Sequence, residues 1–289
     1  MISVCIVGPN SYIGASVERR LVEFPDSYRV FKISVRNDGW QNCDLSRYDV
    51  VIYAAGIVHQ REKKNNRDIY YSVNRDKTGE FARAAKKAGV RQFIFLSSMS
   101  VYGMSSGHIT KDLEPRPDTH YGKSKLEAEN LLKELQSDDF AVAIVRPPLV
   151  YGRGCKGNYP RLSRLATTFP IYPRFTNKRS FVYIGNLAEA IKLIIDSRLS
   201  GTFFPQNREY VDIGMLVPDI ARLHGKKTLL IRGFGRILRI TGMMGGTFEK
   251  VFGDLTYDMD MSTQPNGYQI YGYEESISLT EGVIPGERP

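Results

Sequence analysis

The chain has only three cysteines and four histidines, which argues against a disulfide-linked protein and against a metal-binding protein. Its three cysteines, Cys5, Cys43 and Cys155, are an odd number without C-x-x-C spacing. This pattern argues against a disulfide framework and indicates buried thiols in a reducing compartment. The four histidines are scattered, without ligand spacing among themselves or with cysteine. We therefore expect no metal site.

Long hydrophobic runs are also missing. No stretch approaches the roughly eighteen apolar residues that a membrane-spanning helix needs. The apolar run at residues 2–7 is short and has no basic leader before it, which differs from a signal peptide. The sequence thus predicts no membrane span, and we expect a cytoplasmic protein.

The formal net charge is +9 at pH 7, which suits nucleic acid, an anionic membrane surface or a phosphorylated substrate. Basic residues are spread along the chain, with local clusters at 61–67 and 226–239, so most of this charge is expected on the solvated surface. Residues 231–240 interleave arginines with apolar residues. This pattern is compatible with contact with an acidic membrane surface and equally with a helix packed on the C-terminal half.

The first half of the chain alternates apolar runs with helical patterns, as a parallel sheet covered by helices requires. With 42% hydrophobic residues, the chain can bury a large core without crosslinks. Only about fourteen residues separate the second and third apolar runs, so the helix there must be much shortened. The expected strands are 2–7, 29–35, 50–55, 93–96 and 142–145. The expected helices run from just after Gly14 to about residue 23, from 73 to 88 and from 121 to 135. The pattern predicts an α/β fold with a doubly wound parallel sheet.

A glycine-containing turn follows the first expected strand. Gly8 and Gly14 occupy the first and last positions of a G-x-x-G-x-x-G frame, where the backbone turns tightly or approaches a pyrophosphate at a helix N-terminus. Ser11 replaces the middle glycine and Pro9 follows the first, but the backbone donors and the Ser11 hydroxyl remain for phosphate. The expected dinucleotide contacts in this turn are Gly8, Asn10, Ser11, Tyr12, Ile13 and Gly14.

A second motif opens a later helix, where Tyr121 and Lys125 lie one helical turn apart and share a face. A lysine ammonium beside a phenol is expected to lower the pKa of the tyrosine, which suits proton transfer near neutrality. This spacing alone is common on solvated helices. Here it is joined by Ser98, which follows the strand at 93–96 and is expected at the ligand-binding edge of the sheet.

Taken together, these motifs resemble an extended short-chain dehydrogenase/reductase of the NAD-dependent epimerase/dehydratase family. The resemblance covers roughly residues 1–200 and rests on the glycine turn, Ala54-Ala55-Gly56, Asn74, the SSMSVYG and YGKSK segments, and RPPLVYG at 146–152. It implies a Rossmann-like fold with a smaller C-terminal substrate lobe. The NAD(P)-binding domain would comprise 1–150, with 176–200 threaded back into it, and the substrate lobe 151–175 and 201–289.

The resemblance also assigns roles to residues. Ser98 would hydrogen-bond the sugar hydroxyl or ketone, Tyr121 would transfer the proton, and Lys125 would hold the nicotinamide ribose. Ser97 and Ser100 would be neighbours rather than catalysts. The remaining cofactor contacts would be Ala54, Ala55, Gly56, Asn74, which supports the active-site helix, and Pro147, near the nicotinamide.

Two features near the second strand concern the choice of cofactor. An NAD-preferring protein carries an acidic residue at the end of that strand, whereas this chain has Arg36, which suits a 2′-phosphate. We therefore expect NAD(P)(H), with a preference for NADP(H). Asp44, beside Leu45, would pair with the adenine amino group by the family resemblance.

Substrate contacts are expected in the second half. Arg179 stands where the family has an arginine that meets the diphosphate of the substrate, a contact suited to a guanidinium. Lys156 and Asn158, in a glycine-rich loop, are further candidates for phosphate or sugar contact. For Lys156, an ordinary surface charge is an equal alternative.

The expected substrate is a sugar carried on a nucleotide or a polyprenyl diphosphate. Two reactions share the Ser-Tyr-Lys machinery, C4 epimerisation and reduction of a 4-keto sugar. Dehydration is not expected, because Met99 and Ser100 stand where the family's dehydratases carry carboxylates. The competing hypothesis is a non-catalytic NAD(P) sensor or a nucleic-acid-binding relative of the same fold. No RNA-binding motif is visible, so nucleic acid is not expected as a partner. A homodimer is expected by family resemblance.

Overall fold

A computed structural model describes residues 1–57, 67–231 and 253–283. Most of the basic cluster at 61–67, and residues 232–240 of the arginine-rich segment, lie outside the described residues. The two alternatives for that segment therefore stay open.

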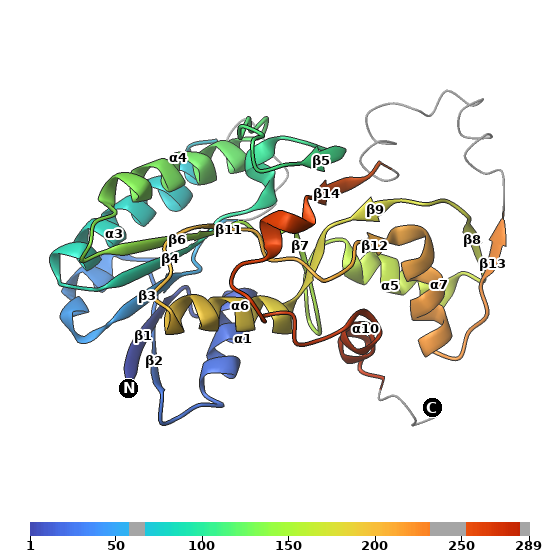
Figure 1. The fold of residues 1–289 in the computed structure, drawn as a ribbon, viewed down its shortest axis with the longest axis horizontal. Coiled ribbons are helices and arrows are strands. Elements are labelled where there is room, and N and C mark those ends of the chain that lie inside the picture. Colours follow the sequence, from blue (N-terminus) through green and yellow to red (C-terminus); the bar gives the residue numbers. More distant parts are fainter. Residues whose placement is uncertain (58–66, 232–252, 284–289) are drawn as a thin grey trace.

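The N-terminal part is built on one six-stranded parallel sheet with the order β11-β6-β4-β3-β1-β2 (Figure 1). The order runs outward in both directions from β1 and β3, as in a doubly wound fold. The predicted fold class is confirmed. The strands are β1 (Ile2–Val7), β2 (Tyr28–Ile33), β3 (Val50–Tyr53), β4 (Gln92–Leu96), β6 (Ala141–Val145) and β11 (Gly201–Phe203).

Helices cover both faces of this sheet. In Figure 1, α3 (Lys77–Lys87) and α4 (His120–Leu135) lie on one face, whereas α1 (Tyr12–Leu21) and α6 (Ile184–Asp196) lie on the other. The short α2 (Arg67–Tyr70) packs beside α4. The helix predicted at 73–88 begins with a π-helical turn, Tyr71–Asp76, before α3, and it ends before Gly89 in a left-handed conformation, as predicted.

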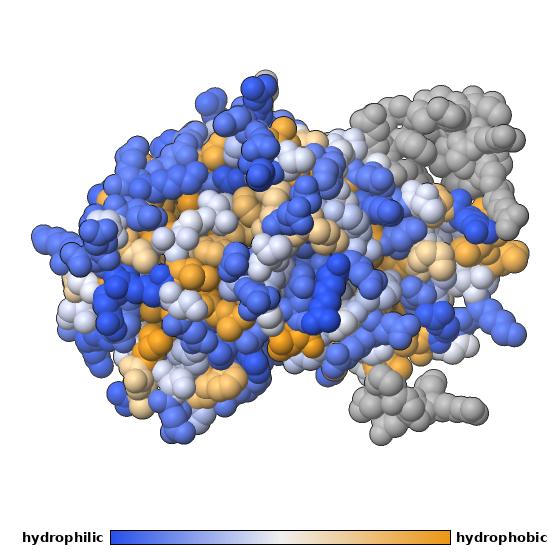
Figure 2. Space-filling view, in the orientation of Figure 1, coloured by the Kyte–Doolittle hydropathy of each residue, from blue (hydrophilic) through white to orange (hydrophobic). Residues whose placement is uncertain are grey.

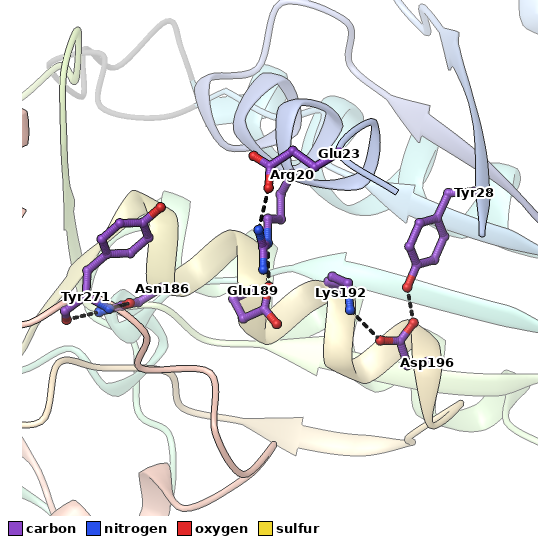
Figure 3. A network of polar contacts seen from close by, with 8 residues as sticks. All are labelled: Arg20, Glu23, Tyr28, Asn186, Glu189, Lys192, Asp196 and Tyr271. Atoms are coloured by element: carbon purple, nitrogen blue, oxygen red, sulfur yellow. Dashed lines mark hydrogen bonds and ion pairs between the residues drawn. The ribbon is translucent and has the colours of Figure 1, made fainter. Parts of the chain in front are cut away.

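Polar contacts hold α6 against the N-terminal part of the fold (Figure 3). Arg20 on α1 donates through Nε to the Glu189 carboxylate at 2.6 Å. At the other end of α6, Asp196 accepts from Tyr28 and from Lys192, the latter at 2.8 Å. Helix α6 therefore packs as part of the N-terminal domain although it lies late in the sequence.

Between β2 and β3 the chain forms only two turns of 3₁₀-helix, Asp38–Asn42 and Leu45–Arg47. The prediction of a much shortened unit is confirmed. After α6 the chain adds β11 to the edge of the sheet beside β6, so the returning segment runs past residue 200. The predicted limit was too early because a parallel strand follows the helix in a crossover unit.

In its described residues, the C-terminal lobe contains short strands and three helices. A four-stranded sheet has the order β12-β9-β14-β5, a second pair joins β10 to β7, and a third joins β13 to β8. The strands are β5 (Gly107–Ile109), β7 (Leu149–Tyr151), β8 (Ile171–Pro173), β9 (Lys178–Arg179), β10 (Phe181–Tyr183), β12 (Val211–Asp212), β13 (Leu229–Ile231) and β14 (Leu255–Tyr257). The helices are α5 (Tyr159–Thr168), α7 (Ile213–Leu223) and α10 (Tyr273–Glu281).

Candidate active site

The glycine turn after β1 has a shape that only glycine permits at its first position. Gly8 has φ +98°, and a Cβ atom there would lie 2.8 Å from the backbone nitrogen of Ala55. The loops after β1 and β3 are therefore in close contact. At Gly14, a Cβ atom would lie 3.0 Å from Cγ2 of Ile6, so the first turn of α1 lies tightly on β1.

The N-terminus of α1 begins inside this turn. Ser11 is the N-cap, and its hydroxyl accepts from the Gly14 amide at 3.3 Å. The amides of Tyr12 and Ile13 belong to the first helical turn, which has no carbonyl partners within the helix. A helix N-terminus of this kind suits an anion such as a pyrophosphate.

The predicted adenosine contacts lie on the loops after β2. Arg36 is exposed, and Asp44 is exposed at the N-cap of the second 3₁₀-helix. The Asp44 carboxylate accepts from the Ser46 hydroxyl at 2.6 Å and the Ser46 amide at 3.1 Å, which lowers its pKa. Leu45 beside it is buried in the core.

Helix α4 begins so that Tyr121 and Lys125 face β4. Thr119 caps the helix by accepting from the Gly122 amide at 3.1 Å. A Cβ atom at Gly122 would lie 2.5 Å from the carbonyl oxygen of Ser100, so glycine allows α4 to approach the loop after β4. Tyr121 and Lys125 are both buried.

Three successive residues at the end of β4 each contact a different residue on one face of α4. The Lys125 ammonium donates to the Leu96 carbonyl oxygen at 2.8 Å, the Ser97 hydroxyl donates to Glu129 at 2.5 Å, and the Ser98 hydroxyl is hydrogen-bonded to Tyr121. The three residues on α4 are spaced four apart, so they follow one another along a single face. The predicted trio Ser98, Tyr121 and Lys125 is thus brought together.

The pKa of Tyr121 corrects one expectation from the sequence. Burial raises this pKa to about 12, the hydrogen bond with Ser98 lowers it, and the neighbouring Tyr70 raises it. The predicted lowering by Lys125 is not found in this structure. Its physical reason is that the loss of hydration of the phenolate outweighs the favourable contacts.

Lys125 shows the opposite effect. Burial lowers its pKa to about 8, and the carboxylate of Glu129 acts against that shift. The ammonium nitrogen also lies 4.5 Å from the centre of the Phe95 ring. A lysine held in this way changes charge close to neutral pH, which suits a group that assists proton transfer.

Asn74 holds the loop after β3 beside α4. Its side-chain oxygen accepts from the Ile57 amide at 2.9 Å, and its side-chain nitrogen donates to the Ser124 hydroxyl at 3.2 Å. A Cβ atom at Gly56 would lie 3.0 Å from the Asn74 oxygen and 3.3 Å from the Lys125 ammonium. The loop Ala54–Gly56 therefore borders Lys125.

The sequence analysis missed a buried ion pair that lies beside the predicted catalytic residues. Arg146 donates to Glu129 through Nη2 at 2.5 Å and through Nε at 3.0 Å, and through Nη1 to the Tyr102 hydroxyl at 2.9 Å. Ser97 contacts the same carboxylate, which agrees with its expected role as a neighbour. Glu129 continues the face of Tyr121 and Lys125 by one turn, and this spacing was the available signal.

The predicted substrate contacts lie farther along the chain. Arg179 is half-buried in β9 and donates to the Gly253 carbonyl oxygen at 2.8 Å. Burial lowers the pKa of its guanidinium, and Asp254 opposes this shift. Lys156 and Asn158 are exposed in the loop before α5. The Pro147 carbonyl oxygen accepts from the Met99 amide at 3.0 Å, which places Pro147 beside the loop after β4.

Within the described residues, no helix has the length and apolar character needed to cross a bilayer. The same part of the chain contains no group of histidine, cysteine and carboxylate residues that could hold a metal ion.

Comparison with known proteins adds independent findings. Residues 4–204 match the profile of the NAD dependent epimerase/dehydratase family. The chain is 30% identical over 190 residues to N-acetyl-alpha-D-glucosaminyl-diphospho-ditrans,octacis-undecaprenol 4-epimerase from Escherichia coli O157:H7. It is 34% identical over 199 residues to UDP-glucose 4-epimerase from Vibrio cholerae. These matches cover 63% and 65% of this chain but only 57% and 60% of those relatives.

Solved structures share the whole fold at low identity. UDP-glucuronic acid 4-epimerase from Bacillus cereus, in complex with NAD, has a TM-score of 0.74 at 18% identity, with 98% of both chains covered. dTDP-4-dehydrorhamnose reductase from Bacillus anthracis, in complex with NADP, has a TM-score of 0.71 at 19% identity, with 96% of this chain and 98% of that chain covered.

Proposed function

The chain belongs to the NAD-dependent epimerase/dehydratase family, and on that premise we propose that it catalyses hydride transfer at C4 of a sugar carried on a diphosphate. The observation that carries this proposal is the Ser98–Tyr121–Lys125 group, assembled between the end of β4 and one face of α4. Hydroxyl groups at the carboxyl end of a parallel strand face the crevice in which such sheets bind ligands. The names of the two relatives favour epimerisation over reduction.

The residues divide the chemistry between them. Tyr121 would take the proton from the sugar's C4 hydroxyl as a hydride leaves C4. After the 4-keto sugar has turned to present its other face for return of the hydride to C4, Tyr121 would give the proton back to the same oxygen, so epimerisation consumes no net proton. Ser98 donates to the same sugar oxygen and orients it toward the phenol. Lys125 lies one helical turn from Tyr121, and its ammonium is the proposed contact to the nicotinamide ribose. When bound, NAD(P) supplies the hydride acceptor and donor.

The turn after β1 fits a dinucleotide. Any side chain at Gly8 would fill the space between the loops after β1 and β3. The adjoining first turn of α1 offers amide donors for a pyrophosphate. Asn74, Gly56 and Lys125 border the position expected for the nicotinamide ribose. Arg36, exposed after β2, favours NADP(H) through a charge-assisted contact with the 2′-phosphate.

The carrier of the sugar is either a nucleotide or a polyprenyl diphosphate. Both bring a diphosphate, for which Arg179 is the proposed partner. Its guanidinium is partly withdrawn from water in β9, which strengthens an ionic contact relative to a fully exposed one. Lys156 and Asn158, in the loop before α5, are the further proposed contacts to phosphate or sugar.

The decisive experiment compares substrates of each kind with the purified protein. UDP-glucose, UDP-N-acetylglucosamine, polyprenyl-diphospho-N-acetylglucosamine and a 4-keto-6-deoxy sugar nucleotide are incubated with NAD or NADPH. The stereochemistry at C4 is followed by NMR and NADPH by absorbance. C4 inversion without net cofactor use identifies an epimerase, whereas stoichiometric NADPH oxidation identifies a reductase.

Tyr121→Phe is the matched control, because it removes only the oxygen that transfers the proton. We expect turnover to be abolished while cofactor binding stays within a few-fold of the wild type. Cofactor binding without turnover of any of these substrates by the wild type would favour the non-catalytic sensor instead.

A further inference from the structure

The end of the C-terminal lobe carries a small apolar sheet face. Strands β8 and β13 pair in parallel, with Ile171 opposite Leu229 and Pro173 opposite Ile231. Side chains alternate along a strand, so these residues share one side of the pair. The other side packs inward, where Tyr172 is buried in the core and Leu230 lies against it.

The outward side is exposed to an unusual degree for large apolar residues. Ile171 is 52% exposed, Leu229 64% and Ile231 42%, and Phe169, just before β8, is 57% exposed. These four residues, with Pro173, form what we call the β8–β13 face. Figure 1 shows β8 and β13 at the end of the molecule that lies away from the six-stranded sheet. Clustered apolar residues on a surface mark a binding site more often than scattered ones.

The segments that build this face carry basic residues and no acidic ones. Residues 140–188 and 220–231 contain no aspartate or glutamate. Figure 2 shows apolar and hydrophilic residues side by side at this end of the molecule. The exposed basic residues on α5, directly after β8 and between α7 and β13 are Arg161, Arg164, Arg174, Lys226 and Lys227. Arg222, at the end of α7, is also exposed but is paired with Asp219.

Hydrogen bonds place two of these basic residues at the border of the face. The Lys226 ammonium donates to the carbonyl oxygen of Thr167, two residues before Phe169. At the other end, the Arg174 amide donates to the Ile231 carbonyl oxygen at 2.9 Å, so Arg174 directly continues the pair of strands. Apolar side chains at the centre and cations at the border are the two components of binding to an anionic membrane surface.

We propose that the β8–β13 face docks on an anionic lipid bilayer. The apolar residues enter the boundary between headgroups and acyl chains, and the surrounding lysines and arginines contact the lipid phosphates. A nucleic acid would match the charge but would leave Phe169, Ile171, Leu229 and Ile231 without an apolar partner. Docking also favours the polyprenyl diphosphate over the nucleotide as carrier of the sugar, and this last step rests on the proposed function.

Docking is tested by cosedimentation of the full chain with vesicles. We expect binding to vesicles of phosphatidylglycerol and phosphatidylcholine, and at least roughly ten-fold weaker binding to phosphatidylcholine alone, because each cation near an anionic surface contributes about 1 kcal/mol. Binding should weaken as salt is raised. Equal binding to both vesicle types, or binding to neither, would overturn the proposal.

Ile171→Glu combined with Leu229→Glu adds two negative charges to the face without changing the core. This variant should lose vesicle binding by roughly ten-fold or more. Val22→Glu is the matched control, since Val22 is 55% exposed at the end of α1 in the other domain. Circular dichroism verifies the fold of each variant. If the control lost binding equally, or if sedimentation velocity showed that the double variant instead dissociated a dimer, the face would not be a lipid-docking surface.

Turnover measured with the same vesicles separates docking from the proposed chemistry. Vesicles should stimulate conversion of the polyprenyl-linked sugar in the wild type and not in the double variant, with conversion of UDP-sugars unchanged. Vesicle binding without turnover of any sugar would refute the proposed function and leave docking supported. Turnover without vesicle binding would refute docking and leave the function supported.

Discussion

Among single residues, Lys125 has a pKa that burial and a neighbouring carboxylate shift in opposite directions. Its ammonium is removed from water, which favours the neutral amine, while Glu129 favours the charged form. The hydrogen bond to the Leu96 carbonyl oxygen fixes the nitrogen at the end of β4. Lys125 is therefore fixed in position, and its side chain can gain or lose a proton near neutral pH.

The pH dependence of cofactor binding tests this view. Because the pKa of Lys125 is lowered to about 8, the ammonium predominates below that pH and the neutral amine above it. If the ammonium holds the nicotinamide ribose, affinity for NAD(P) should fall as pH rises through about 8. Calorimetric titrations should show this step in the wild type and in Lys123→Met, whose lysine is exposed on the same helix, but not in Lys125→Met.

Arg179 is expected to bind the diphosphate of the substrate. A charge-assisted hydrogen bond contributes roughly 1.5–3 kcal/mol, so Arg179→Ala should raise KM about ten-fold or more. Cofactor affinity should barely change. The control is Lys178→Ala, which removes an exposed neighbouring cation. An unchanged KM for every active substrate, or a loss of dinucleotide binding instead, would move the diphosphate site to Lys156 or Arg161.

The proximity of Ser98, Tyr121 and Lys125 could be predicted because its signals are local. Tyr121 and Lys125 lie one turn apart on a helix, and Ser98 directly follows a recognisable strand. Arg146 and Glu129 could not be paired from sequence, since nothing local tells which of many charged residues meet in the core. The predicted direction of the Tyr121 pKa shift was wrong for a similar reason. The pKa is raised by burial of the phenol, which arises only in the folded chain.

At the scale of elements, Glu129 and Arg146 join α4 to the ends of β4 and β6. The Glu129 carboxylate is fully buried and accepts from both Ser97 and Arg146. Removing one partner of a buried ion pair leaves the other charge without compensation. The pair therefore fixes the distance between the helix that carries Tyr121 and the strand that carries Ser98.

We expect Glu129→Gln to lower the free energy of unfolding by about 3–5 kcal/mol. Glu127→Gln, which affects a half-exposed ion pair with Arg75 on the same helix, should change it by less than about 1 kcal/mol. Urea denaturation followed by circular dichroism measures both. Equal stabilities of the two variants would show that the buried pair does not hold α4 in place.

The loop after β2 should decide the choice of cofactor. Arg36 lies three residues beyond the end of that strand, where a 2′-phosphate would approach. Arg36→Asp removes the cation and adds an acceptor for ribose hydroxyls, so the ratio of NADP(H) to NAD(H) affinity should fall by about ten-fold or more. Arg47→Asp in the next 3₁₀-helix serves as the control. An unaltered ratio in Arg36→Asp would place the 2′-phosphate elsewhere.

Most strands of the large sheet were predictable, whereas β11 and the strands of the small sheet were not. The strands β1, β3 and β4 are largely buried apolar runs that can be recognised from their own residues. The four-stranded sheet instead joins very short strands from segments far apart in the chain. Strands of two or three residues carry no readable period, and their pairing depends on the completed fold.

At the scale of the whole molecule, one hydrophobic cluster connects the two lobes. It extends from Val4 in the large sheet through Ile191 on α6 to Ile220 on α7 and Ile277 on α10. A second cluster lies on the other side of the sheet and includes Trp40. Because the first cluster contains residues of both lobes, opening the C-terminal lobe would expose apolar surface of the sheet as well.

We therefore expect the two lobes to unfold in a single transition. Cys5 is buried in the sheet and Cys155 in the shared cluster, and burial raises the pKa of both thiols, so both should resist labelling in the native state. In a urea series, pulse labelling of both cysteines, resolved by mass spectrometry, should share one midpoint with Trp40 fluorescence. The expectation of buried thiols is wrong for Cys43, which is exposed. Cys43 should therefore react throughout the series, which controls for reagent quality. Labelling of Cys155 at a clearly lower urea concentration than Cys5 would mean that the lobes unfold independently.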